Sequence, residues 1–496
     1  MQPNWLSLPV EIWLQIFSLR IPLRDLAGFC LTCSHFLSIT RPILFHKLTL
    51  TAEKKDQSPN SAVVATFTLL ANNADLARSV RELTLDSHSQ SASYFRNPGL
   101  VDIHSLRNMT QLKRVTIIGD ISRHAARSDM ASFLQILYNL QLDELRIPSP
   151  GARLFILPLG PAELDQLANP KRITFYVGPA DNNELLSFRL SNILRAAKPS
   201  LTSLSLTGRS PHLNALFSLQ FPLLRSLAII NTFDIRLSCP PGFNAFLSVH
   251  HETLEELHLG YTDRSEFNNG PVYHRPAAIL LNAESGLHPD FLPNLKVFRG
   301  HCLNIELMAR ARMRCLTGFR ELTVSSALQD SDRTMANVEQ MLVALEAAGR
   351  LDALKILDFD LFQWNEHERD VAASFVKRIA ALCGPTLEVW RGLLPFAFAD
   401  WWPIDVFATF SRLRIISLPR DETTLEIFAP FSPRAAVRGR EIHEIAEICT
   451  TLEEVNIVSS LVSDEEDTCW KVYRSRSGLG VKQISGPDLR LLDEPV

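Results

Sequence analysis

The sequence predicts a mixed α/β chain, in which a short helical segment at the amino terminus precedes a long array of strand–helix repeats. One apolar pattern, typical of a short buried strand, recurs along the 496 residues. Stretches with helical spacing of apolar residues separate its copies. Residues 8–48 contain three short predicted helices, which bury too little surface to form a core by themselves.

The first predicted helix starts near Pro9. Proline tolerates the first turn because no backbone partner is needed there, and the carboxylate of Glu11 meets the positive end of the helix dipole. The apolar side chains that follow share one wide face: Ile12, Trp13, Ile16 and Phe17.

Two further helices complete the segment. Pro22 opens the second, whose apolar side chains are Leu23, Leu26, Ala27 and Cys30. Ser34 is placed to cap the third, which is predicted to end before Pro42. So much apolar surface on about 40 residues indicates that another surface covers it.

Read in order, this segment resembles an F-box. The matching stretches are Leu8-Pro9-Val10-Glu11-Ile12, Ile16-Phe17, Pro22-Leu23-Arg24-Asp25-Leu26, Cys30, Cys33, Phe36 and Leu44-Phe45-His46-Lys47-Leu48. Phe45 departs from the family, because many members carry Trp there. The alternative is an ordinary helical cap on a repeat domain.

The resemblance implies a partner and a role. F-boxes dock on the small adaptor subunit of cullin-RING ubiquitin ligases, and the rest of the chain recruits the protein to be ubiquitinated. Cullin and the RING subunit would join indirectly. The expected adaptor contacts are Leu8, Pro9, Glu11, Ile12, Ile16, Phe17, Leu23 and Leu26.

The recurring strand pattern is apolar-x-x-apolar-x-apolar. Its clear copies are Val80-x-x-Leu83-x-Leu85, Leu112-x-x-Val115-x-Ile117, Leu142-x-x-Leu145-x-Ile147, Leu201-x-x-Leu204-x-Leu206, Leu224-x-x-Leu227-x-Ile229, Leu254-x-x-Leu257-x-Leu259, Phe319-x-x-Leu322-x-Val324, Leu354-x-x-Leu357-x-Phe359, Leu413-x-x-Ile416-x-Leu418 and Leu452-x-x-Val455-x-Ile457. Weaker copies are Pro170-x-x-Ile173-x-Phe175, Leu295-x-x-Phe298-x-Gly300 and Leu387-x-x-Trp390-x-Gly392, and Phe45-x-x-Leu48-x-Leu50 also fits.

The spacing of these copies resembles that of irregular leucine-rich repeats. The steps between middle positions run from 23 (204 to 227) to 41 (257 to 298) and centre near thirty. Such units supply a strand and a return helix, and they bury their apolar faces only by stacking. The resemblance implies a solenoid with a curved parallel sheet inside and helices outside. The expected domains are an F-box at 1–48, about 13 repeats at 49–480, and a cap or tail at 481–496.

Helices are predicted between several strand copies. Apolar residues recur at helical spacing in Ala62–Leu70, Ala131–Leu140, Leu185–Ala197, Ala336–Ala348 and Val371–Cys383. A non-repeat α/β arrangement of the irregular middle is the alternative to the solenoid.

Composition excludes several classes of protein. A net charge of −4 and a pI near 6.4 give no electrostatic footprint for nucleic acid. No segment reaches the roughly 18 uncharged apolar residues that a membrane span needs. Eight irregularly spaced cysteines suit a reducing compartment. A cytoplasmic or nuclear location is therefore expected, without nucleic acid or membrane as partners.

No motif predicts an enzyme, a metal site or a cofactor. Cys30, Cys33 and His35 have zinc-like spacing but lack a fourth ligand. Residues 250–252, His-His-Glu, are better explained by a solvated loop, and residues 478–482 lack the spacing of a phosphate-binding loop. We therefore expect a non-catalytic protein.

A substrate surface is predicted in the carboxy-terminal half. Strand residues between the core positions face the concave side of a leucine-rich array, and here they mix both charge signs. Gly300 and Gly392 remove side chains from two strand cores, which suggests a backbone that bends or is approached closely. The predicted contacts are Arg299, His301, Asp358, Asp360, Trp364 and Arg391.

Three functions from different classes remain open. The chain is a substrate receptor of a cullin-RING ligase, an F-box scaffold acting outside ubiquitination, or an enzyme. The first is favoured, and the sequence does not identify its substrate.

Overall fold

The structure is a computed structural model. It describes residues 12–13, 28, 31–51, 61–87, 103–119, 136–137, 139–140, 142–147, 170–176, 194–195, 197–208, 216–231, 242–260, 281, 287–325, 331–360, 369–392, 404–419, 442–458, 468–475 and 478–485. The chain divides into two compact units, unit 1 at Met1–Leu224 and unit 2 at Arg225–Val496. Each unit is a mixed α/β structure built on an open sheet.

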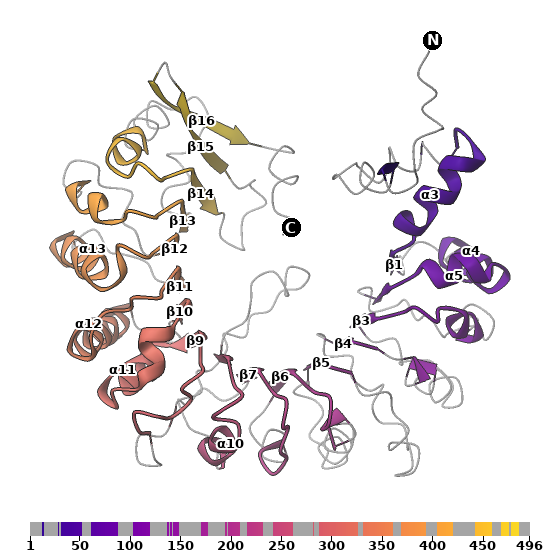
Figure 1. The fold of residues 1–496 in the computed structure, drawn as a ribbon, viewed down its shortest axis with the longest axis horizontal. Helices are drawn as coiled ribbons and strands as arrows, with labels where there is room; N and C mark the ends of the chain where they lie inside the picture. The colour runs from indigo at the N-terminus through magenta and orange to yellow at the C-terminus, as the bar shows by residue number, and fades with distance from the viewer. Residues whose placement is uncertain are drawn as a thin grey trace. The chain divides into compact units, whose positions relative to one another are not determined.

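Unit 1 contains a parallel sheet whose strands lie in chain order. Its elements are α3 (Ser34–Leu44), β1 (Lys47–Thr51), α4 (Ser61–Asn72), α5 (Ala74–Ser79), β2 (Glu82–Ser87), the 3₁₀ helix η2 (Ile103–Asn108), β3 (Arg114–Gly119), β4 (Glu144–Ile147), β5 (Arg172–Tyr176) and β6 (Ser203–Gly208). Each of β1 to β5 pairs with the next strand along the chain. In Figure 1, α4 and α5 lie on one side of these strands.

Unit 2 repeats this arrangement and ends in a hairpin. Its elements are β7 (Ser226–Asn231), α10 (Phe243–Val249), β8 (Glu256–Leu259), β9 (Val297–His301), α11 (Cys302–Arg310), η5 (Arg314–Gly318), β10 (Glu321–Ser325), α12 (Ser331–Ala348), β11 (Ile356–Asp360), α13 (Arg369–Cys383), β12 (Val389–Arg391), η8 (Ile404–Thr409), β13 (Ile415–Pro419), β14 (Glu454–Val458), β15 (Thr468–Ser475) and β16 (Gly478–Ser485). Strands β7 to β14 are parallel, and β15 and β16 are antiparallel. Helices α11, α12 and α13 lie on one side of the strands (Figure 1).

The apolar pattern places the strands correctly. Every parallel strand from β1 to β14 overlaps one of the predicted cores. In β2, Leu83 and Leu85 are buried, whereas Glu82, Thr84 and Asp86 between them are half-buried. This alternation is expected of a strand with only one face against a core.

Backbone hydrogen bonds join each repeat to the next at the turn before the strand. The carbonyl of Arg81 accepts bonds from the N–H groups of Lys113 and Arg114, at 2.8 and 3.0 Å. In unit 2 the carbonyl of Arg225 accepts from Glu255 and Glu256 in the same way, at 2.7 and 2.9 Å. Main-chain groups thus supply the hydrogen bonds at these turns.

The helix predictions are confirmed for α4, α12 and α13. In the two predicted helices at 131–140 and 185–197, only 136–137, 139–140, 194–195 and 197 are described, and most of these are helical. The pattern did not predict α5, α10 and α11, which span only 6, 7 and 9 residues. Such short helices carry little periodic signal, and packing stabilises them.

One helix end differs from the prediction. Cys33 occupies the N-cap of α3 and Ser34 is its first residue, while the helix continues past Pro42 to Leu44. A proline near the end removes one N–H, but Phe45 still donates to the Arg41 carbonyl at 3.1 Å. Packing of Ile43 and Leu44 on a small core makes the last turn favourable.

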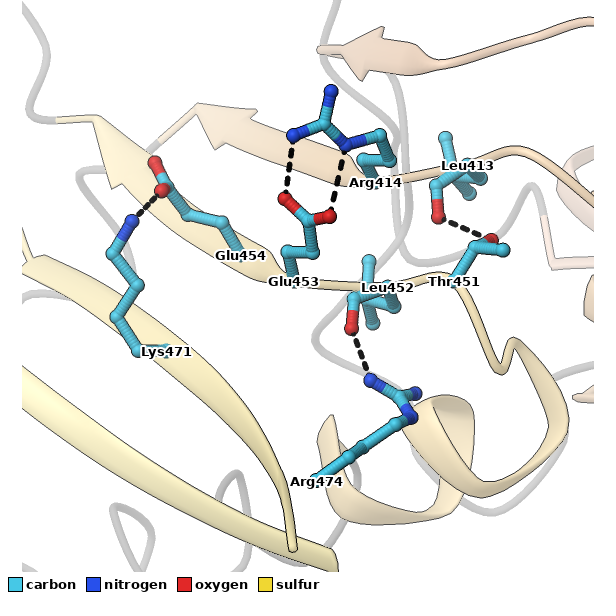
Figure 2. Close-up of polar contacts among 8 residues, drawn as sticks. All are labelled: Leu413, Arg414, Thr451, Leu452, Glu453, Glu454, Lys471 and Arg474. Carbon is cyan, nitrogen blue, oxygen red and sulfur yellow. Dashed lines mark hydrogen bonds and ion pairs between the residues drawn. The ribbon is translucent and has the colours of Figure 1, made fainter.

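The sequence did not predict the carboxy-terminal hairpin of β15 and β16. Residue 480, the expected boundary between the repeats and the cap or tail, lies inside β16. Figure 2 shows how the hairpin is attached. Lys471 of β15 forms an ion pair with Glu454 of β14. Arg474 donates to the carbonyls of Leu452, Ala446 and Cys449 at 2.6, 2.7 and 3.0 Å. The hairpin therefore covers the last parallel strand and the helical turn before it.

Among the residues that the structure describes, no helix is long and apolar enough to cross a membrane.

Candidate functional site

The amino-terminal segment has a small core of its own. Trp13 and Ile39 are buried at its centre, with Phe36, Ile43 and Leu44 packed around them. The rings of Trp13 and Phe36 meet edge to face, with centroids 4.8 Å apart and planes at 81°. This contact fixes α3 against the first predicted helix.

Large apolar side chains remain at the surface of the same segment. Leu31 is 88 % exposed, and Ile12 and Leu37 are 39 % and 40 % exposed. Water contact with so much apolar surface is unfavourable, so a partner that covered it would be bound more tightly. Of the predicted adaptor contacts, only Ile12 lies within the described residues. The other seven lie outside them: Leu8, Pro9, Glu11, Ile16, Phe17, Leu23 and Leu26.

Unit 2 contains a second candidate site, a row of residues that alternate with the apolar core positions and of which Thr323 and Ser417 are buried. The register aligns Ala228, His258, Arg299, Thr323, Asp358, Arg391, Ser417 and Asn456 across successive strands. We call these residues the inner row. Because alternate residues of a strand point to opposite faces, the inner row lies across the sheet from core residues such as Leu322.

Arg299 is held in place within the inner row. Its guanidinium donates to the carboxylate of Glu321 at 2.7 and 2.9 Å, and both side chains are mostly buried. The ion pair crosses from β9 to β10 and orients the positive charge. Sequence reasoning missed Glu321, although a glutamate at the first position of the next strand was a usable signal.

Asp358 and Arg391 occupy matching positions on β11 and β12. Asp358 is half-buried and Arg391 is exposed, so opposite charges lie on neighbouring strands. Asp360 is the last residue of β11, and the predicted contact Trp364 lies outside the described residues. Of the predicted substrate contacts, Arg299, Asp358 and Arg391 therefore lie in one row across the strands.

His301 has a different position from these three. It is only 1 % exposed, and its Nδ1 accepts a hydrogen bond from the Leu303 N–H at 3.2 Å, which caps α11. Burial lowers the pKa of the imidazole to about 4, so the ring is neutral near pH 7. In this structure His301 supports the helix start and offers no surface to a partner.

The two glycines of the strand cores have packing explanations. A Cβ on Gly300 would lie 2.9 Å from the ring of Phe298, which occupies the space of the missing side chain. Gly392 has φ +68°, and a Cβ there would lie 2.1 Å from the carbonyl oxygen of Phe359. The prediction that other groups lie close to these two glycines is confirmed, but those groups belong to the protein's own core. The glycines therefore do not by themselves indicate a binding site.

In unit 1 the corresponding rows carry a network of ion pairs. Arg114 contacts Glu82 at 2.8 Å and Glu144 at 3.2 Å, and Arg146 contacts Glu144 at 2.6 Å. Three neighbouring strands are joined in this way, and their charges neutralise one another. In unit 2, by contrast, the exposed Arg391 has no ion pair with a described residue.

Three buried cysteines of unit 2 are poorly suited to nucleophilic chemistry. Burial raises the pKa of the thiols of Cys302, Cys315 and Cys383 to about 12. A protonated thiol is a weak nucleophile and a weak metal ligand. Their arrangement is that of core residues.

Comparison with known proteins adds one match. Residues 5–51 match the family model described as F-box-like. No curated protein matches the chain. The chain thus carries an F-box-like domain over the segment whose apolar side chains are exposed, and F-box domains bind adaptor subunits in the assembly of SCF-type ubiquitin ligases.

Proposed function

We propose that this protein is the substrate-recognition subunit of a cullin-RING ubiquitin ligase of the SCF type. The F-box-like domain at residues 5–51 carries the proposal, because it supplies an adaptor-binding module directly before the strand–helix units. The protein itself would be non-catalytic. Its contribution to the reaction is to hold a bound protein near the ubiquitin-loaded enzyme and raise the effective concentration of its lysines.

The repeated units are proposed to be leucine-rich repeats that stack as a solenoid. The recurring apolar triads, the parallel strands in chain order and the helices on one side of them support this assignment. Such an array offers an extended strand surface for another protein.

The adaptor contact is proposed to involve Leu8, Pro9, Glu11, Ile12, Ile16, Phe17, Leu23 and Leu26. The test is capture of the purified adaptor by the full-length protein and by a Pro9→Ala/Ile12→Ala variant. We expect the variant to lose binding, because it removes apolar contacts from a small interface. A Leu223→Ala/Val249→Ala variant is the matched control, since both side chains are about half exposed in other parts of the chain.

Adaptor binding at the wild-type level by a correctly folded Pro9→Ala/Ile12→Ala protein would refute the assignment. Circular dichroism of each variant checks the fold.

The target protein is proposed to bind the inner row of unit 2 and its loops, around Arg299, Asp358, Asp360, Trp364 and Arg391. Mixed charges with an aromatic anchor suit protein recognition, and the opposite signs at Asp358 and Arg391 would favour a partner with complementary charges. Arg391→Glu with Trp364→Ala should change the set of bound proteins, whereas Arg114→Glu should not. The reverse result would move the site to unit 1.

A scaffold that binds the adaptor outside ubiquitination is the second candidate, because the F-box-like domain alone accounts for adaptor binding. Co-purification of cullin with the full-length protein separates the two. Its presence supports the ligase subunit, and an adaptor complex without cullin supports the scaffold.

A further inference from the structure

Basic residues gather in unit 1 at the end of the sheet where β1, β2 and β3 begin. They are His46, Lys47, Arg78, Arg81, Arg107 and Lys113, and we call them the basic edge. The row of residues just before the strands places three of them in register, because Arg81 N–H donates to the His46 carbonyl and Lys113 N–H to the Arg81 carbonyl. Stacked repeats thus bring together residues that lie more than 30 positions apart in the sequence.

The basic edge lines two surface pockets. The first, of about 660 Å³, is lined by Ile43, His46, Lys47, Arg78, Ser79 and Arg81. The second, of about 540 Å³, is lined by Arg107, Thr110, Gln111, Lys113, Ile136, Asn139 and Leu140. Both combine cations with hydroxyl or amide groups and aliphatic side chains. Planar guanidinium groups match carboxylate and phosphoryl groups particularly well.

Local structural roles account for part of this charge. Arg78 lies in the last turn of α5 and Arg107 in the last turn of η2, where a cation stabilises the negative end of the helix. Arg78 also pairs with Asp75 at 3.1 Å, although both side chains are largely exposed. Neither role applies to Lys47 or Arg81.

Lys47 and Arg81 have no ion pair with any described residue, and both are exposed. The nearby carboxylates are already engaged. Asp143, next in the row after Lys113, pairs with Lys171 at 3.0 Å, and Glu82 pairs with Arg114 at 2.8 Å. The described part of the basic edge therefore carries excess positive charge next to the two surface pockets.

We propose that the basic edge binds an extended acidic segment of a partner protein, with one anionic group in each pocket. The anionic groups are carboxylates or phosphoryl groups, which share the recognition chemistry. A nucleic acid fits less well, because the basic surface is short, Asp75 and Asp143 flank it, and the described residues that line the two pockets include no Phe, Tyr or Trp on which bases would stack. This surface shares no residue with the inner row or with the proposed adaptor contacts.

The geometry predicts the spacing of the two anions. The first pocket centres on the rows of β1 and β2, and the second on those of β3 and β4, so they are two strand spacings or about 10 Å apart. A peptide in the extended polyproline II conformation rises about 3.1 Å per residue and completes a turn every three residues, so anions at positions i and i+3 lie on one side and would reach both pockets.

The test measures binding of fluorescein-labelled peptides to the full-length protein by fluorescence anisotropy at low salt. The peptides have a Gly-Ser background with two glutamates at i and i+3, two phosphoserines at those positions, or two glutamines. A single-stranded oligouridine is the nucleic-acid probe. Binding of either acidic peptide with little binding of the glutamine peptide is expected, and the stronger acidic probe identifies the preferred anion.

An Arg81→Gln/Arg107→Gln variant should weaken that binding about tenfold, or about 1.4 kcal/mol, because it removes one guanidinium charge from each pocket. Lys47→Gln is a second, milder variant that should weaken it less. Arg350→Gln/Arg412→Gln is the matched control, because both arginines are exposed in unit 2 and have no ion pair with a described residue. It should bind like the wild type.

Three results would overturn the proposal: equal peptide binding by the Arg81→Gln/Arg107→Gln and control variants, equal binding of the acidic and glutamine peptides, or binding of oligouridine alone. Adaptor capture, measured on the same samples, reports separately on the proposed function and on folding.

Discussion

Single residues in this protein show how backbone geometry restricts side-chain choice. Gly392 combines a left-handed φ of +68° with a backbone approach that leaves no space for a Cβ. Its N–H donates to the Ser417 carbonyl at 2.7 Å, so it also joins β12 to β13. The position therefore demands glycine for two independent physical reasons.

Replacing this glycine should destabilise the protein. We expect Gly392→Ala to lower the free energy of unfolding by about 2–4 kcal/mol, from backbone strain together with the clash against Phe359. Urea denaturation monitored by circular dichroism measures it. Gly318→Ala is the control, because a Cβ there meets nothing within 4 Å. Equal stability of the two variants would show that the backbone at Gly392 relaxes freely.

At the scale of elements, side chains join each strand to its neighbour. Arg414 of the turn before β13 forms two hydrogen bonds with Glu453 before β14, at 2.8 and 3.0 Å (Figure 2). Arg225 with Glu255, and Lys355 with Glu388, occupy the same place in other repeats. Opposite charges at this position help to align neighbouring repeats, since a shifted register would separate them.

The Arg414–Glu453 pair should make a small, pH-dependent contribution to the free energy of unfolding. The hydrogen bonds from Arg414 lower the pKa of the Glu453 carboxyl. A depressed pKa in the folded state stabilises the protein above the unfolded value of about 4.3, and this stability is lost as the pH falls through the folded pKa. Both side chains are about half exposed, so the coupling is at most about 1 kcal/mol.

A double-mutant cycle with Arg414→Gln and Glu453→Gln measures this coupling by thermal unfolding. It should be present near pH 7 and fade towards about pH 3. Coupling that is unchanged at the lower pH would mean that charge is not its source.

The hairpin β15–β16 should depend on Arg474. Its guanidinium satisfies three carbonyls of the preceding repeat, and hydrogen bonds to a charged group contribute about 1.5–3 kcal/mol each. We expect Arg474→Leu to increase hydrogen exchange in β15 and β16 well above that of β10 and β11. The neighbouring change Tyr473→Thr, at a side chain 49 % exposed, should leave exchange nearly unchanged. Similar exchange in both variants would remove Arg474 from this role.

For the whole molecule, the sequence predicts that residues from about 45 to 490 form one continuous solenoid. Within each unit, strands pair with their neighbours along the chain, so stability there depends on contacts between successive repeats. Small-angle X-ray scattering of the full-length protein should give an elongated particle. A compact, near-spherical particle would contradict the solenoid.

The sequence by itself determined the strand positions, because a strand that buries one face must alternate apolar and polar residues, and the triads around Leu83, Leu257 and Leu322 record that alternation. It also determined α12 and α13, which span enough turns to show a period. The F-box-like segment was legible for a similar reason, since its apolar positions follow a fixed order.

Only the tertiary structure decided the features that depend on neighbouring repeats. The burial of His301, the clash that excludes a side chain at Gly392 and the attachment of β15 by Arg474 depend on groups from other strands or helices. The basic edge likewise forms only when His46, Arg81 and Lys113 come into register. The physical reason is that local sequence encodes periodicity, whereas contacts between repeats depend on stacking distances that the sequence pattern does not contain.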